Sequence, residues 1–227
     1  MPREGAPIEL TSAQAGLWLA QTLDPENPTF NVCDAVEIDG PVDAVLLQRA
    51  AHAAVTESDA LTTRFVAHGD GWRQLPGHWE LELPVVVEAG PGDPWSVMRG
   101  LIGEWMSTPT DLTAEAGVRQ WILSAGERAF WVLAAHHALI DAYGLSLVFK
   151  RGAALYQALE AGTEPAGAPL RSIVDVVQAD LDYLAAPERD ADAAFWEQLA
   201  AAHPAGDDDG GQARRVHSAR AELPALS

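Results

Sequence analysis

A single stretch in the middle of the chain constrains the fold most. From Phe130 to Ala135 every residue is apolar, and His136-His137 follow directly after. Consecutive strand residues point to opposite faces, so a strand of this kind must be covered by other elements on both sides. A second strong strand at 118–123 precedes it and is joined to it around Ala125-Gly126. The pair therefore predicts the centre of a sheet that helices cover on each face.

Helical and strand patterns alternate through the rest of the chain. Apolar residues at helical spacing predict helices at 10–23, 42–55, 94–106, 145–159, 173–184 and around 195–199. The first opens with Thr11-Ser12-Ala13-Gln14, a capping-box pattern, the second is expected to hold Pro41 in its first turn, and Ser172 is expected to cap the fifth. Runs rich in β-branched residues predict strands at 31–38, 61–66, 72–75 and 81–87. The order predicts a layered α/β lobe.

The composition excludes two classes of partner. The chain has 33 acidic residues against 14 Lys and Arg, a formal net charge of -19. Such a surface repels phosphate groups, so neither nucleic acid nor an anionic lipid surface is expected to bind it. No stretch is apolar for long enough to predict a membrane span. Cys33 is the only cysteine, which rules out an internal disulfide and suits a reducing cytoplasm.

The segment 136–144, His-His-Ala-Leu-Ile-Asp-Ala-Tyr-Gly, is the most informative for chemistry. Adjacent strand residues face opposite ways, so His137 is predicted to face an open side while His136 packs inside. A histidine titrates near neutrality and is suited to take a proton from an attacking amine or to orient that amine. Asp141 lies where strand becomes helix and is expected to hold the turn through a basic side chain or backbone amides. A backbone amide at the start of that helix is suited to stabilise an oxyanion.

Two other interpretations of this segment stay open on the residues alone. Two adjacent histidines and an aspartate also occur as core filler and a helix cap, without any catalytic role. A metal site is the second alternative, but adjacent strand histidines diverge and no third ligand stands at metal-binding spacing.

The segment resembles the His-His-x-x-x-Asp signature of the condensation-domain superfamily of nonribosomal peptide synthetases. Three further segments resemble that family in the same order along the chain. Residues 10–18 are similar to its Ser-x-Ala-Gln-x-x-Leu-Trp opening helix, residues 59–65 to its Arg-His-Glu-x-Leu-Arg-Thr-x-Phe segment, and Phe195-Trp196 to a late aromatic pair. The resemblance extends over residues 8–223. It implies a mixed sheet with flanking helices, one lobe of a two-lobed fold like that of chloramphenicol acetyltransferase.

The segment around residue 60 departs from the family pattern at its arginines. The family's two arginines fall here on Glu57 and Thr62. One of those arginines commonly pairs with the aspartate of the histidine motif. Arg64 lies two residues beyond Thr62 on the same strand face, so we expect it to take over as the partner of Asp141.

Two small residues and the length of the chain also depart from the family. Ala142 stands where the family usually has glycine, and Gly144 where serine is common. If position 142 needs a positive φ angle, alanine adds strain there. The family has two similar lobes with the active site between them, and this chain is about one lobe long.

The resemblance implies an enzyme that joins carrier-bound acyl and aminoacyl thioesters through an amide bond. It makes His137 the catalytic residue and gives His136 and Asp141 structural roles. It implies carrier protein domains, a C-terminal lobe and downstream synthetase domains as partners. It implies no cofactor or metal on this lobe, because the substrates arrive on the phosphopantetheine of the carriers. The expected boundaries are a tail at 1–7, the lobe at 8–204, a mobile acidic Gly-rich loop at 205–214 and the start of a crossing strand at 215–227.

Two rival functions remain on the sequence. One is a CoA-dependent acyltransferase of the same superfamily, and the other is a non-catalytic remnant or interaction lobe. We expect the isolated chain to be inactive, since half of a two-lobed tunnel cannot orient two substrates. Only about ten residues precede the first predicted helix, too few for a carrier domain. We therefore expect the first catalytic unit of a synthetase, which takes a starter acyl group from a separate protein as siderophore synthetases do.

Overall fold

The computed structural model describes residues 6–90 and 93–202. The helices are α1 (Ser12–Leu23), α2 (Ala44–Glu57), α3 (Pro94–Ser107), α4 (Ala142–Ala161), α5 (Ile173–Ala185) and α6 (Pro187–Ala202), with a short 3-10 helix η1 (Pro28–Phe30). The strands are β1 (Asn31–Asp39), β2 (Arg64–His68), β3 (Gly71–Leu75), β4 (Val85–Glu88), β5 (Val118–Ala125) and β6 (Arg128–His136). The chain divides between Asp182 and Tyr183 into two compact units, and the second contains α6.

The main sheet is mixed, as predicted. Its four strands lie in the order β1-β6-β5-β4, with β6 antiparallel to both neighbours and β4 parallel to β5. The strand predicted to be central is central, and every residue of β6 after Arg128 is buried. The hairpin between β5 and β6 turns at Gly126, whose φ of 69° is the left-handed conformation that glycine adopts without cost.

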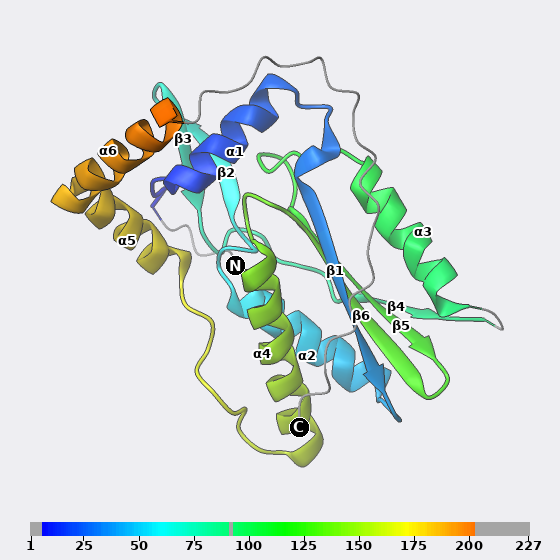
Figure 1. The fold of residues 1–227 in the computed structure, drawn as a ribbon. Coiled ribbons are helices and arrows are strands. Elements are labelled where there is room, and N and C mark those ends of the chain that lie inside the picture. Colours follow the sequence, from blue (N-terminus) through cyan, green and yellow to red (C-terminus); the bar gives the residue numbers. More distant parts are fainter. Residues whose placement is uncertain (1–5, 91–92, 203–227) are drawn as a thin grey trace. The chain divides into compact units, whose positions relative to one another are not determined.

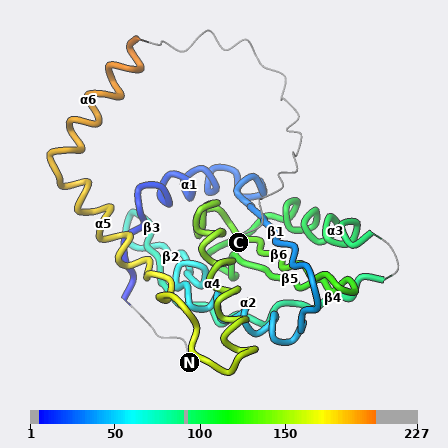
Figure 2. Tube along the Cα trace, turned by 60° about the horizontal axis from the view of Figure 1, so that its bottom comes forward, coloured from blue at the N-terminus to red at the C-terminus, as the bar shows by residue number. Residues whose placement is uncertain are grey.

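Helices cover the two faces of this sheet with separate apolar clusters. On one face, buried residues of α2 and α4 pack against Trp131 and Leu133 of β6. On the other face, Met98 of α3 packs against Phe130 and Val132. Figure 1 shows α2 and α4 together on one side of the strands and α3 apart from them, and the turned view in Figure 2 shows the same arrangement. Because successive side chains of β6 point to opposite faces, Trp131 and Leu133 contribute to one cluster, and Phe130 and Val132 to the other.

The small second sheet carries the N-terminal segment. Strands β2 and β3 form an antiparallel hairpin with its turn at Gly69-Asp70, and Ile8 adds a bridge to Gln74 of β3. Helix α1 follows this segment directly. Thr11 caps the helix and exchanges the two hydrogen bonds of a capping box with Gln14. The predicted capping box is therefore confirmed.

Several predicted boundaries shift for local reasons. Helix α2 begins after Asp43, whose carboxylate accepts from the amides of Val45 and Leu46, so Pro41 lies outside the helix. Strand β4 begins only at Val85, since Pro84 has no N–H to give to a ladder. Ser172 accepts from the amide of Val174 at the start of α5, as predicted. The predicted acidic loop at 205–214 and the crossing strand at 215–227 lie outside the described residues.

Candidate active site

The two histidines lie at the end of β6, where a short turn leads into α4. His136 is the last residue of the strand and is 1% exposed, whereas His137 is exposed. The predicted orientation of the pair is therefore confirmed. The physical reason is that β6, covered on both faces, ends at His136, while His137 is the first residue of the turn that leads into α4.

Hydrogen bonds fix both the backbone and the ring of His137. Its amide donates to the Phe30 carbonyl at 2.7 Å, and its ring Nδ1 lies 3.0 Å from the Ile140 carbonyl oxygen. A carbonyl oxygen only accepts, so Nδ1 carries the proton of this bond. The neutral ring therefore has its lone pair on Nε2, where it can accept a proton from a substrate.

His136 is held in the opposite tautomer. Its Nδ1 accepts from the Ala138 amide at 3.1 Å, so its Nε2 carries the proton and donates to Gln21 Oε1 at 3.2 Å. Burial, together with the neighbouring His137, lowers the pKa of His136 from 6.5 to about 4. His136 is therefore a neutral structural residue at ordinary pH.

Two buried glutamines of α1 contact the histidine turn, and the sequence interpretation, which assigned Gln14 only to the capping box, missed both contacts. Gln14 Nε2 donates to the Ala138 carbonyl at 3.1 Å, and Gln21 accepts from His136. They are seven residues apart and flank Trp18 on the buried face of the helix. Seven residues is two helical turns, so a polar pair at this spacing on an otherwise apolar face was the signal available in the sequence.

Asp141 caps α4 and does not pair with Arg64. Its carboxylate accepts from the Gly144 amide at 2.7 Å, which confirms the predicted backbone role. The prediction of Arg64 as its partner is wrong. Arg64 Nε donates to the Thr113 carbonyl at 2.8 Å, and its guanidinium lies over the ring of Trp79. Arg64 belongs to the small hairpin sheet, which directs its side chain to that loop and not to the start of α4.

The two small residues after Asp141 adopt ordinary helical backbone. No described residue other than glycine has a positive φ angle, so Ala142 carries no strain of the kind considered. Gly144 has a packing reason to be small, because a Cβ there would lie 2.7 Å from Ile140 Cγ1. Ala142 and Tyr143 are the first two residues of α4, and first-turn amides have no helical acceptor.

Glu57, at one of the family's arginine positions, forms a partly buried ion pair within this chain. Arg151 of α4 donates from Nε and Nη2 to the two Glu57 carboxylate oxygens, each at 2.7 Å. The side chain of Arg151 is only 7% exposed, and it also donates to the Ala166 carbonyl. These hydrogen bonds lower the pKa of Glu57, because they favour the ionised carboxylate. The pair joins the end of α2 to α4.

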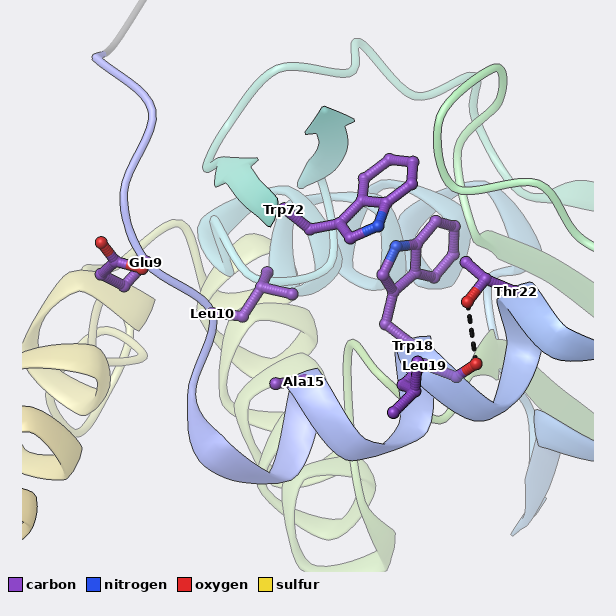
Figure 3. A pocket seen from close by; sticks show the side chains of 7 residues that line it. All are labelled: Glu9, Leu10, Ala15, Trp18, Leu19, Thr22 and Trp72. Carbon is purple, nitrogen blue, oxygen red and sulfur yellow. Dashed lines mark hydrogen bonds between the residues drawn. The ribbon is translucent and has the colours of Figure 1, made fainter. Parts of the chain in front are cut away.

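Two cavities in the described chain are lined by residues other than His137. One of about 190 Å³ is lined by Trp18 and Trp72 with Leu10, Ala15, Leu19, Thr22 and Glu9, and Figure 3 shows the two indoles side by side above α1. Another of about 480 Å³ is lined by residues 79–85 with Ala114–Ala116 and Val118–Gln120. Within 6–90 and 93–202, no three His, Cys, Asp or Glu residues lie together as a metal site requires. In the same ranges no helix is long and apolar enough to cross a membrane.

This chain is similar to parts of nonribosomal peptide synthetases. The family model of the condensation domain matches residues 6–205. A dimodular nonribosomal peptide synthase of Bacillus subtilis is 32% identical over 189 residues, which cover 82% of this chain and 8% of that protein. Enterobactin synthase component F of Escherichia coli O157:H7 is 29% identical over 84% of this chain and 15% of its own length.

Solved structures give the same answer at the level of the fold. A starter condensation domain of rhizomide synthetase, in complex with C8-CoA and Leu-SNAC, superposes with a TM-score of 0.79 at 28% identity. The match covers 86% of this chain and 45% of that one. The first condensation domain of the CDA synthetase gives a TM-score of 0.79 at 26% identity over 88% of this chain and 52% of its own. The chain thus spans about half of the solved domains, and it belongs to the condensation-domain family.

Proposed function

We propose that this chain is the histidine-bearing half of a condensation domain that forms an amide bond between two thioester-bound groups. The observation that carries the proposal is the state of His137. Its Nδ1–H is engaged with the Ile140 carbonyl, which leaves Nε2 as the acceptor of an exposed ring. A base in that state can accept a proton from, or orient, an attacking amine.

The proposed reaction is a direct acyl transfer. The amine of the acceptor attacks the thioester carbonyl, the C–N bond forms and the C–S bond breaks, and no covalent intermediate on the protein is involved. The amine proton passes to His137 Nε2 and then to the departing thiolate. The amides of Ala142 and Tyr143 at the start of α4 are the groups suited to stabilise the oxyanion. Asp141, through its cap on Gly144, and His136 support this arrangement without contacting substrate.

The proposed partners are carrier protein domains, a C-terminal lobe and further synthetase domains. Both substrates would arrive on the phosphopantetheine arms of carriers, so this lobe needs no cofactor of its own. The relatives named above are nonribosomal synthetases, which supports this assignment. The single cysteine, Cys33, is consistent with a reducing cytoplasm as the place of action.

We further propose a starter acyl group as the donor. The rhizomide domain is a starter condensation domain, and enterobactin synthase is among the relatives. Because that starter domain was solved with C8-CoA, a CoA thioester is the second candidate donor. Thr62 at one of the family's arginine positions, and the absence of an Arg64–Asp141 pair in the described structure, favour a third candidate, a non-catalytic lobe.

One experiment separates these functions. The chain is fused to the second half of the rhizomide starter domain and given octanoyl carrier protein or octanoyl-CoA with an aminoacyl carrier. Mass spectrometry then follows the acyl-aminoacyl product. We expect product from the carrier-bound donor, loss of at least about 100-fold in rate for His137→Ala, and no product from residues 1–227 alone. Product from octanoyl-CoA but not from octanoyl carrier protein would instead establish the CoA-dependent activity. A folded fusion without any product, or with full activity after His137→Ala, would contradict the proposal.

A further inference from the structure

The orientation of the Gln21 side chain is fixed by its surroundings. Its Nε2 lies 3.2 Å from each of three carbonyl oxygens, those of Asp24, Pro25 and Asn27. These oxygens only accept, so the NH₂ group must face them and Oε1 must face His136. A glutamine buried to this degree on a helix is costly unless its polar atoms are paired, and here all of them are.

This orientation determines the tautomer of the neighbouring histidine. Gln21 Oε1 requires a proton on His136 Nε2, while the Ala138 amide requires a lone pair on His136 Nδ1. The two requirements agree on one neutral form of the ring. A second proton on Nδ1 would oppose the Ala138 N–H and would place a positive charge beside His137.

The same side chain is connected to the backbone of His137 through the loop that follows α1. The loop whose carbonyls Gln21 holds runs directly into η1, and the carbonyl of Phe30 at the end of η1 accepts the His137 amide at 2.7 Å. Gln21 therefore fixes both the residue before His137 and the acceptor for its backbone. No other side chain in the described structure bonds both to His136 and to this loop.

We propose that Gln21 is a positioning residue, which holds His136 in its Nε2–H tautomer and holds the loop that anchors His137. The inference rests on the proposed role of His137 in acyl transfer. Glutamine is the side chain that fits, because glutamate accepts from His136 but cannot donate to the loop, and leucine or methionine does neither. The consequence for function is that the backbone of the His136-His137 turn is held at two points, the residue before His137 and the acceptor of the His137 amide.

The test uses NMR on the whole chain with ¹⁵N-labelled histidine. In the wild type we expect His136 to show a protonated Nε2 and a bare Nδ1 from pH 8 to about pH 5. In Gln21→Glu we expect its titration midpoint to rise by at least about one pH unit, since a carboxylate favours the imidazolium. In both Gln21→Glu and Gln21→Met we expect the His137 amide to exchange with deuterium at least about tenfold faster. The matched control is Gln178→Glu, an exposed helical glutamine, which should change neither quantity.

Three outcomes would overturn the proposal. The first is a wild-type His136 with its proton on Nδ1 or a midpoint near that of a free histidine, which needs no variant at all. The second is a folded Gln21→Glu chain whose His136 titrates as in the wild type. The third is unchanged exchange of the His137 amide in both Gln21 variants. None of these readouts uses amide formation, so failure of the proposed activity is recognised separately.

Discussion

The burial of His136 ties the stability of the chain to pH. The pKa of this residue is about 4 in the folded state against 6.5 for an unperturbed histidine. Between those values the unfolded chain binds a proton that the folded chain does not, so the free energy of unfolding falls as the pH drops from 6.5 towards 4. The full contribution is roughly 3 kcal/mol, and it is present above pH 6.5. Urea unfolding at pH 7 and at pH 4.5 should show this loss in the wild type.

The variant His136→Gln isolates the residue-scale effect. Glutamine does not titrate, so the free energy of unfolding of this variant should change with pH by about 2–3 kcal/mol less than that of the wild type. The variant His68→Gln removes an exposed histidine and should keep the wild-type dependence. Equal pH dependence in His136→Gln and the wild type would show that His136 is not buried in its neutral form.

At the level of elements, the contact between α4 and β6 depends on one glycine. A Cβ on Gly152 of α4 would lie 2.3 Å from the ring of Trp131, whereas a Cβ on Gly100 of α3 would meet nothing within 4 Å. We therefore expect Gly152→Ala to destabilise the chain by about 1–3 kcal/mol through overpacking. Gly100→Ala should stabilise it by about 0.5–1 kcal/mol, because alanine favours a helix. Thermal melts of the two variants test both predictions. Changes in stability of the same sign would contradict the packing of α4 on β6.

At the level of the whole molecule, the exposed aromatic pair of α6 should govern association. Phe195 is 58% and Trp196 is 64% exposed, and their rings lie edge to face at 5.4 Å. Aromatic surface of this kind favours contact with another protein over contact with water. We expect the purified chain to self-associate, and Phe195→Gln/Trp196→Gln to weaken the association at least about tenfold. Sedimentation over a concentration series measures this. The control is Leu23→Gln, at another exposed apolar residue. If it weakens self-association equally, the aromatic pair of α6 has no special role.

The sequence alone determined the features that depend on neighbours along the chain. The unbroken apolar run of β6 placed it at the centre of the sheet, with His136 as its last buried residue. The capping pattern set the start of α1, and the position of Asp141 before a helix set its bond to a backbone amide. For the two caps the partner lies within a few residues, and for β6 the residue types themselves require cover on both faces, so the local pattern contains the information.

Only the tertiary structure decided which distant side chains meet. Arg64 is the first residue of β2, and the small hairpin sheet carries it to Thr113 instead of Asp141. Glu57 and Arg151 are far apart in sequence and became partners because α2 and α4 share one face of the sheet. Gln21 reached His136 because the end of α1 lies against the end of β6. A residue's type and spacing set the direction in which it points along its own element, whereas its partner depends on how the elements pack, which the local pattern does not encode.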